Sequence, residues 1–217
     1  TATFVVTGKD VPFSTADVTV SSYSNKYDGA AHGIGVTVAD GIAGAVVKYA
    51  TTANGDFAAT EPTLTDVGSM TVWCEIDAPG YITQTNSATI TITKRTVTLT
   101  SGSASKAYDG TPLTKHTVTA GGDGFVSDEG ATYSYTGTQT EVGSSVNNFS
   151  YTLKSNTKAG NYTITTVPGT LTVTKRPVMV TVTGHTATHT YDGTEKTLDA
   201  FDLATKDELY DVDKNTY

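Results

Sequence analysis

The chain has 217 residues and carries 22 acidic against 14 basic residues, a formal net charge of −8. Binding to a phosphate backbone rests on clustered Lys and Arg, so this charge argues against nucleic acid as a partner. Hydrophobic residues make up 37% and charged residues 17%, and the chain is rich in Tyr, Val and Thr, unlike disordered sequences. Because Val and Thr are stiff at χ1 and pack well on a pleated surface, strands are favoured over helices.

The first 15 residues predict the closing strand of a preceding repeat, because residues 1–7 alternate between polar and apolar types. A following unit, residues 16–94, shows several short strand signals. Turn residues separate these signals, at 40–41, 54–56 and 77–80. The strands expected in this unit lie around residues 17–22, 34–38, 45–49, 70–77 and 87–93.

A second unit, residues 95–175, is expected to follow almost directly, with an opening strand at 96–100 and a closing strand at 169–174. Glu141-Val142-Gly143 stands where the first unit has Asp66-Val67-Gly68, and both precede a strand-like run. Residues 146–148 interrupt that run before 149–153, and residues 161–165 add a further run. The topology of the second unit can therefore differ in detail from the first.

Internal repetition is the strongest signal in the sequence. The triplet Tyr-Asp-Gly occurs three times at spacings of 81 and 83 residues, and Thr-Lys-Arg occurs at residues 93–95 and 174–176 with the same step of 81. Two markers in phase define a tandem repeat. Residues 176–217, with an opening run at 178–182, are then a partial third repeat. The triplets are Tyr27-Asp28-Gly29, Tyr108-Asp109-Gly110 and Tyr191-Asp192-Gly193.

These signals predict an all-β chain of tandem β-sandwich modules in an elongated array. Residues 66–73 resemble the E–F corner and F strand of immunoglobulin-like bacterial modules, which implies that the modules are immunoglobulin-like. A β-grasp module, with one helix across a sheet, is the alternative. The open strand edges of the partial repeat also suggest strand exchange with residues 1–7 of a neighbouring molecule.

The Tyr-Asp-Gly triplet is interpreted as a structural turn at a strand end. Asp accepts bonds from nearby backbone N–H groups, Gly supplies a positive φ, and Tyr buries its ring with the hydroxyl at the edge. The competing interpretation is a carbohydrate or protein contact through Tyr and Asp. Strand tyrosines that could bind a ligand, or pack across strands instead, are Tyr133, Tyr135, Tyr151 and Tyr162.

No catalytic residue, metal site or cofactor is predicted, because no enzyme motif is present. Cys74, the one cysteine, is expected to be a buried thiol. His185 and His189 are interpreted as exposed strand histidines rather than a zinc pair, since no third ligand is near. The acidic residues 207–215 have the spacing of a calcium loop without its Gly and distal Glu, which favours a solvated loop. An isopeptide bond between Lys26 and Asn86 is a further hypothesis.

The Tyr-Asp-Gly triplets, the Val-Gly corners at 66–68 and 141–143, and the closing run at residues 171–177 resemble the MBG/YDG-type repeats of large bacterial surface proteins and adhesins. The resemblance implies a secreted stalk on the bacterial cell surface or cell wall that projects a distal binding region. Its partners would be neighbouring repeats of the same chain. The alternatives are a repeat that itself binds a host glycan or protein, and an accessory region of a secreted enzyme. No apolar run reaches membrane-span length, and no signal peptide opens the sequence, so a secretion signal is expected elsewhere.

Overall fold

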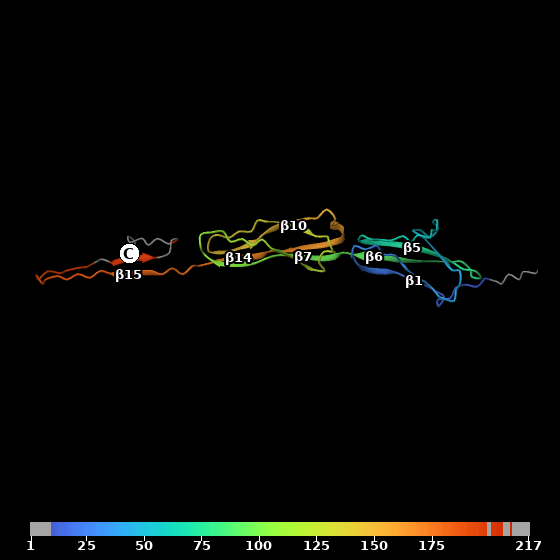
Figure 1. The fold of residues 1–217 in the computed structure, drawn as a ribbon, viewed down its shortest axis with the longest axis horizontal. Helices are drawn as coiled ribbons and strands as arrows, with labels where there is room; N and C mark the ends of the chain where they lie inside the picture. The colour runs from blue at the N-terminus through green and yellow to red at the C-terminus, as the bar shows by residue number, and fades with distance from the viewer. Residues whose placement is uncertain (1–9, 199–200, 206–208, 210–217) are drawn as a thin grey trace, which may run out of the picture. The chain divides into compact units, whose positions relative to one another are not determined.

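A computed structural model describes residues 10–198, 201–205 and 209 of the chain. Within these residues the structure consists of strands and one single-turn 3₁₀ helix, Ala159–Asn161, with no α-helix (Figure 1). The prediction of an all-β chain with several sheets is confirmed. A β-grasp module needs an α-helix across its sheet, and the described residues contain no α-helix.

The strands follow one another closely along the chain. They are β1 (Val18–Ser21), β2 (Tyr23–Lys26), β3 (Gly35–Val38), β4 (Val46–Ala50), β5 (Gly68–Asp77), β6 (Gln84–Thr93), β7 (Arg95–Ser101), β8 (Ala104–Ala107), β9 (Val118–Gly122), β10 (Ala131–Tyr135), β11 (Gly143–Asn147), β12 (Phe149–Leu153), β13 (Tyr162–Val167), β14 (Gly169–Thr174), β15 (Val180–Gly184) and β16 (Phe201–Thr205).

The chain divides into two compact units. The first comprises residues 1–99, 120–132 and 151–166, and the second comprises residues 100–119, 133–150 and 167–217. In the first compact unit, a four-stranded sheet has the order β2-β6-β5-β4, and β1 pairs with β3 in a two-stranded sheet. In the second compact unit, the order β11-β14-β8 forms one sheet and β15-β16 another. The remaining described sheets are β13-β7-β9 and β10-β12.

We refer to residues 16–94, 95–175 and 176–217 as the first, second and third sequence repeat. The opening strand of the first repeat changes sheet at Ser22. The sequence predicted one strand around residues 17–22, whereas the structure has β1 antiparallel to β3 and then β2 parallel to β6. The sequence of β2, Tyr-Ser-Asn-Lys, lacks an alternating apolar pattern, so its pairing with β6 decides its conformation.

The second repeat reproduces this parallel pairing in phase. In β2–β6, Tyr23 lies opposite Ile90, and in β8–β14, Ala104 lies opposite Leu171, each shifted by the same 81 residues. Side-chain bonds repeat too, because Ser22 Oγ accepts from Thr89 N–H and Ser103 Oγ accepts from Thr170 N–H. The sequence period is therefore also a period of hydrogen bonding.

The core follows the alternation expected of strands with one buried face. In the second half of β5 and of β6 every second residue is buried, at 72, 74 and 76 and at 88, 90 and 92, and β7 and β14 alternate in the same way from their third residue. The apolar side chains with the least exposure are Val72, Cys74, Ile76, Ile90, Val97, Leu99, Leu171 and Val173. Cys74 is thus a buried free thiol, as predicted.

Two strands that are continuous in the first repeat are divided in the second. Where the first repeat has the ten-residue β5, the second has β11 and β12, separated at Asn148. Where it has β6, the second has β13 and β14, separated at Pro168, which lacks the N–H that a ladder needs. The sequence anticipated the interruption near residue 148.

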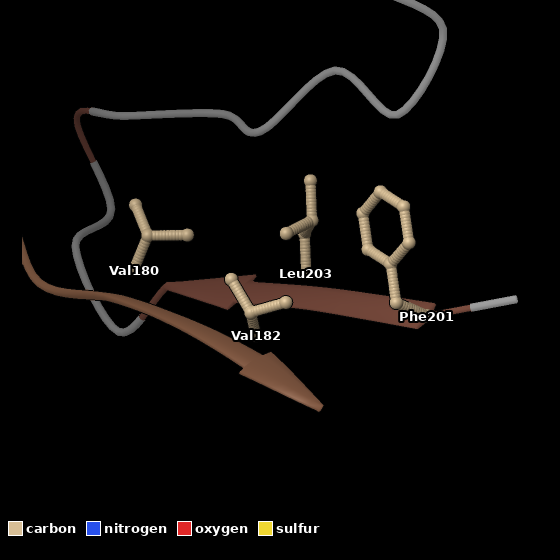
Figure 2. A pocket seen from close by; sticks show the side chains of 4 residues that line it. All are labelled: Val180, Val182, Phe201 and Leu203. Atoms are coloured by element: carbon tan, nitrogen blue, oxygen red, sulfur yellow. The ribbon is translucent and has the colours of Figure 1, made fainter. Parts of the chain in front are cut away.

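The described part of the third repeat contains an antiparallel pair, β15 and β16, in which Val182 lies opposite Leu203. Four apolar side chains line one hollow of this pair, Val180, Val182, Phe201 and Leu203 (Figure 2).

The predicted closing strand at residues 1–7 lies outside the described residues. The acidic run 207–215 also does, apart from Leu209. No described helix is long and apolar enough to cross a membrane.

Candidate functional site

The three Tyr-Asp-Gly triplets share one backbone turn. In each, the Asp Oδ1 accepts a hydrogen bond from the N–H two residues later, at 2.9 Å for Asp28, 2.9 Å for Asp109 and 3.0 Å for Asp192. The glycines have φ of 83°, 78° and 77°, which L-residues rarely adopt. This is the Asx turn followed by a left-handed residue that the triplet favours locally.

Each Asp carboxylate also binds a cationic or imidazole side chain. His32 lies 2.9 Å from Asp28, Lys106 lies 2.6 Å from Asp109, and Lys196 lies 2.7 Å from Asp192. These side-chain contacts most of all, and then the turn N–H groups, lower the pKa of all three carboxyl groups, to about 2 at Asp192. The carboxylates therefore serve the turn as permanent acceptors.

The tyrosines of the three triplets have different surroundings. Tyr27 is 4% exposed, whereas Tyr191 is 93% exposed, and Tyr108 is intermediate. The backbone role of the first and second is the same, because Tyr27 N–H donates to Thr93 O and Tyr108 N–H donates to Thr174 O, each at 2.9 Å. The backbone turn is therefore the same in the repeats, whereas the contacts of the tyrosine ring differ from one repeat to the next.

The Tyr27 ring belongs to a buried polar cluster with residues of the second repeat. Its hydroxyl donates to Glu129 Oε1 at 2.6 Å, and the Tyr162 hydroxyl donates to Glu129 Oε2 at 2.6 Å. The two rings meet edge to face with centroids 5.7 Å apart. Burial first, and the Glu129 carboxylate second, raise the pKa of each tyrosine to about 12. One carboxylate thus holds two tyrosines from different repeats.

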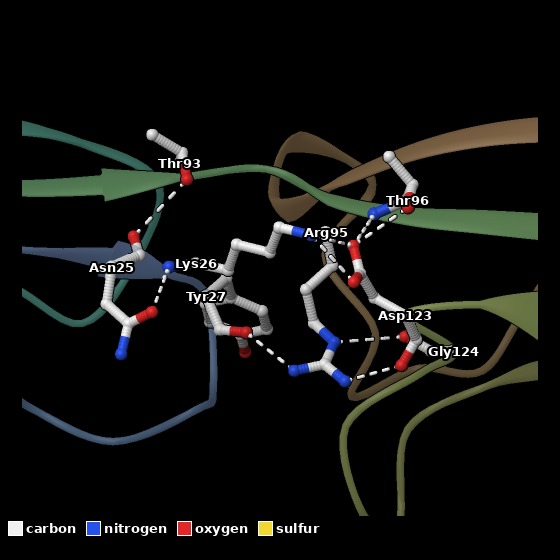
Figure 3. A network of polar contacts seen from close by, with 8 residues as sticks. All are labelled: Asn25, Lys26, Tyr27, Thr93, Arg95, Thr96, Asp123 and Gly124. Atoms are coloured by element: carbon white, nitrogen blue, oxygen red, sulfur yellow. Dashed lines mark hydrogen bonds and ion pairs between the residues drawn. The ribbon is translucent and has the colours of Figure 1, made fainter.

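Arg95, the last residue of the first Thr-Lys-Arg marker, binds three carbonyl groups around this cluster (Figure 3). Its guanidinium donates to Gly124 O at 3.0 Å, to Asp123 O at 2.5 Å and to Tyr27 O at 3.3 Å. Arg suits this position because its planar guanidinium offers five donors in a rigid fork. The marker therefore ties the start of β7 to the first Tyr-Asp-Gly turn.

The Asp123 carboxylate joins Lys26, in front of the turn, to Thr96 in β7 (Figure 3). Lys26 Nζ lies 2.7 Å from Oδ1, and Thr96 donates to Oδ2 through both its N–H and its hydroxyl, at 2.9 and 2.8 Å. Lys26 first, and Thr96 second, hold the pKa of Asp123 well below its usual range. Half of the Lys26 side chain is exposed, so this ion pair stabilises only weakly.

The Val-Gly corner of the first repeat contacts the 3₁₀ helix of the second. Asn161 Oδ1 accepts from Val67 N–H at 2.9 Å, while its Nδ2 donates to Asp66 Oδ1 at 2.9 Å. Lys158 Nζ lies 2.6 Å from Asp66 Oδ2. Asn161 first, and Lys158 second, lower the pKa of Asp66. We call the residues Lys26, Tyr27, Asp66, Val67, Arg95, Asp123, Glu129, Lys158, Asn161 and Tyr162 the junction cluster.

No family model, curated protein or solved structure matches this chain. The resemblance to MBG/YDG-type repeats thus rests on the sequence motifs alone.

The structure separates the other candidate residues. Lys26 lies opposite Thr93, and Asn86 lies seven residues earlier in β6, about 23 Å away at the usual strand rise. The isopeptide hypothesis is therefore wrong.

His185 and His189 are exposed but follow β15 outside any strand, which corrects their predicted strand position. His185 Nε2 lies 2.7 Å from Asp202 Oδ2. Among the described residues, no three His, Cys, Asp or Glu side chains gather as a metal site.

The strand tyrosines mostly pack against other rings. Tyr133 meets Phe149 edge to face at 6.2 Å, and Tyr135 stacks on His116 at 4.9 Å. Tyr162 lies in the junction cluster, while Tyr151 is exposed. Sequence reasoning missed Glu129 and Asn161, which lie in no repeated motif. The recurrent Arg at the end of Thr-Lys-Arg was a signal that could have identified Arg95.

Alkaline titration tests the Tyr27–Glu129–Tyr162 contact. An unfolded tyrosine titrates near pH 10 and these two titrate near 12. Because the pKa of each tyrosine is higher in the folded than in the unfolded chain, the protonated hydroxyl stabilises the folded chain fully below pH 10. This stabilisation is lost as the pH rises towards 12. The free energy of unfolding should fall between pH 10 and 12, by up to about 1.4 kcal/mol per pH unit for each tyrosine.

Urea unfolding at a series of pH values measures this slope. The Tyr27→Phe variant should give a shallower slope, and Tyr191→Phe, which changes an exposed ring, is the matched control. An equal slope in the Tyr27→Phe variant and the original chain would contradict the assignment.

Proposed function

We propose that this chain is a set of structural stalk repeats from a secreted bacterial surface adhesin, with immunoglobulin-like modules in tandem that project a binding region from the cell. The motif resemblance supports the location at the cell surface. The repeated parallel pairing of β2 with β6 and of β8 with β14 supports the load-bearing role, and it carries the proposal.

Parallel pairing matters because of how tension would act on a repeat. β2 lies near the start of the first repeat and β6 closes it, and the two run in the same direction with Tyr23 opposite Ile90. A pull on both ends draws the strands past one another along their axes. All hydrogen bonds of the ladder then carry the load together, instead of breaking one after another.

The junction cluster supports the same role. Only Lys94 separates β6 from β7, and the contacts of Arg95 and Tyr27 join residues of both repeats. A short linker that is held by side chains limits bending between neighbours, as in other repeat arrays. Tandem modules of this kind supply length in proportion to their number.

Single-molecule stretching of the chain tests the proposal. Held by its two ends, the chain should show two strong unfolding events, each releasing up to about 280 Å of extended chain. The comparison is a chain held at its C-terminal end and at Asn54→Cys, an exposed loop position. Cys74 is buried, so the new thiol is the reactive one.

In the second geometry the force peels β5 from β6, beginning where Gly68 lies opposite Ile92. Bonds then break singly, and the first repeat should unfold at a clearly lower force. The second repeat is pulled identically in both experiments and serves as the internal control. Equal unfolding forces for the first repeat in both geometries would rule out the load-bearing ladder.

A further inference from the structure

The segment that opens the first repeat contains extra residues in front of β1. Val11 pairs with Tyr81, and Tyr23 pairs with Ile90. Between these two pairs the opening segment advances by twelve residues while the closing segment advances by nine, so the opening segment is longer by three residues. The extra residues form a turn in which Ser14 N–H donates to Asp17 Oδ2 at 2.7 Å and Asp17 N–H donates to Ser14 O at 3.0 Å. The turn displaces the chain just before Val18.

The second repeat has no such displacement. There, β7 runs continuously from Arg95 to Ser101 and pairs with β13. In the first repeat, β1 pairs only with β3 among the described strands. The start of β6 therefore faces β1 across a gap that the second repeat closes with a ladder.

This gap is a hollow of about 250 Å³. Hydroxyl and amide side chains make up most of its wall, with two valines of β1 and one aromatic ring. The lining residues are Phe13, Ser14, Thr15, Val18, Val20, Gln84, Asn86 and Ser87. We call it the β1–β6 hollow.

Two amide side chains occupy core-facing positions beside the hollow. Gln84 and Asn86 continue the alternation of Ala88 and Ile90 in β6, and their partners in β5 are Ile76 and Cys74, both fully buried. Gln84 Oε1 is buried and has no hydrogen-bond partner in the protein. A buried acceptor left unsatisfied costs about 1–3 kcal/mol, so Gln84 Oε1 lacks a partner that a ligand in the hollow could supply.

The composition of the hollow defines the ligand that it suits. None of its lining side chains is charged, which favours a neutral ligand, and its hydroxyl and amide groups can both donate and accept hydrogen bonds. Val18 and Val20 offer an apolar wall, and Phe13 stacks on Tyr81 with ring centroids 4.5 Å apart. A pyranose ring combines hydroxyl groups at its edge with an apolar C–H face.

We propose that the β1–β6 hollow binds one neutral sugar ring, a hexose or N-acetylhexosamine at the end of a glycan. Because Gln84 Oε1 is closed off from water in the free chain, the Gln84 amide turns into the hollow when the sugar binds. There it accepts from a sugar hydroxyl, and the C–H face of the ring packs on the valine wall. The volume lies just below the roughly 300–1,000 Å³ of pockets for drug-sized ligands, so it suits one ring rather than an extended oligosaccharide. The second repeat has no equivalent site, because β7 and β13 pair there.

Nuclear magnetic resonance titration of the ¹⁵N-labelled chain tests this site. The probes are galactose, glucose, mannose, N-acetylglucosamine and N-acetylgalactosamine. At least one should shift the side-chain amide signals of Gln84 and Asn86, with a Kd of about 1 mM, while signals of the second repeat stay in place. If none of the five sugars shifts these signals, the proposal is wrong.

Matched variants decide whether Gln84 binds the sugar. Gln84→Met removes the buried oxygen at similar volume and should weaken binding at least about tenfold, with a thermal midpoint that is unchanged or higher. Gln139→Met, the same change in the second repeat, should bind as the original chain does. If Gln84→Met does not fold, Val20→Phe fills the hollow from the opposite wall and should also prevent binding. Unchanged binding in the folded Gln84→Met chain, or in Val20→Phe, overturns the assignment.

Discussion

Replacement of Tyr27 by Ala is expected to lower the free energy of unfolding by about 3–5 kcal/mol, the range for large buried aromatic residues. The ring is 4% exposed, meets Tyr162 edge to face and donates to Glu129. Truncation leaves a cavity between the two repeats and removes one of the two hydroxyl groups that Glu129 accepts from. Denaturant unfolding, followed by tryptophan fluorescence, measures the loss.

The chain provides its own control for this substitution. Tyr191 belongs to the same triplet but is 93% exposed, so Tyr191→Ala should change the stability by no more than about 0.5 kcal/mol. Tyr27→Phe keeps the ring and removes the hydroxyl, and it should fall between the two. Equal losses for Tyr27→Ala and Tyr191→Ala would show that the triplet stabilises through its turn alone.

Asn147→Ala is expected to have a comparable effect, about 2–4 kcal/mol, in the second compact unit. Asn147 is fully buried, and its Nδ2 donates to Gly102 O and Lys115 O, both at 2.8 Å. Its own carbonyl accepts from the Ser101 hydroxyl at 2.7 Å. Removal of the amide leaves two carbonyl groups without these donors, and each unsatisfied buried group costs about 1–3 kcal/mol.

The neighbouring residue supplies the control. Asn148 is exposed, so Asn148→Ala should change the stability by less than about 0.5 kcal/mol. Thermal and urea unfolding of the two variants, side by side with the original chain, gives the difference. If both variants lose the same stability, the effect comes from the strand break at this position and not from the buried amide.

Much of the strand pattern could be predicted from the sequence. The closing strand β14 and the strand β12 have the predicted bounds, and β5 and β6 extend the predicted runs by a few residues. These segments alternate apolar and polar residues, and alternation reports a buried face directly. The strands β2 and β8 were missed, because their short polar sequences become strands only by pairing with β6 and β14.

The triplets divide in the same way between local and distant causes. The Asx turn and the positive φ of Gly29, Gly110 and Gly193 follow from residues within three positions, so the sequence alone determines them. The surroundings of the tyrosine do not follow from the triplet. The Tyr27 hydroxyl reaches Glu129, which lies 102 positions away.

By itself, the sequence determined the all-β class, the phase of the repeats and the turn that each Tyr-Asp-Gly makes, because alternation and turn chemistry act over a few neighbouring residues. Only the tertiary structure decided that Tyr27 is buried while Tyr191 is exposed, that the opening strand changes sheet, and that a gap separates β1 from β6. Those features depend on pairings between segments far apart in the chain. Three identical triplets cannot indicate which distant residues each of them contacts.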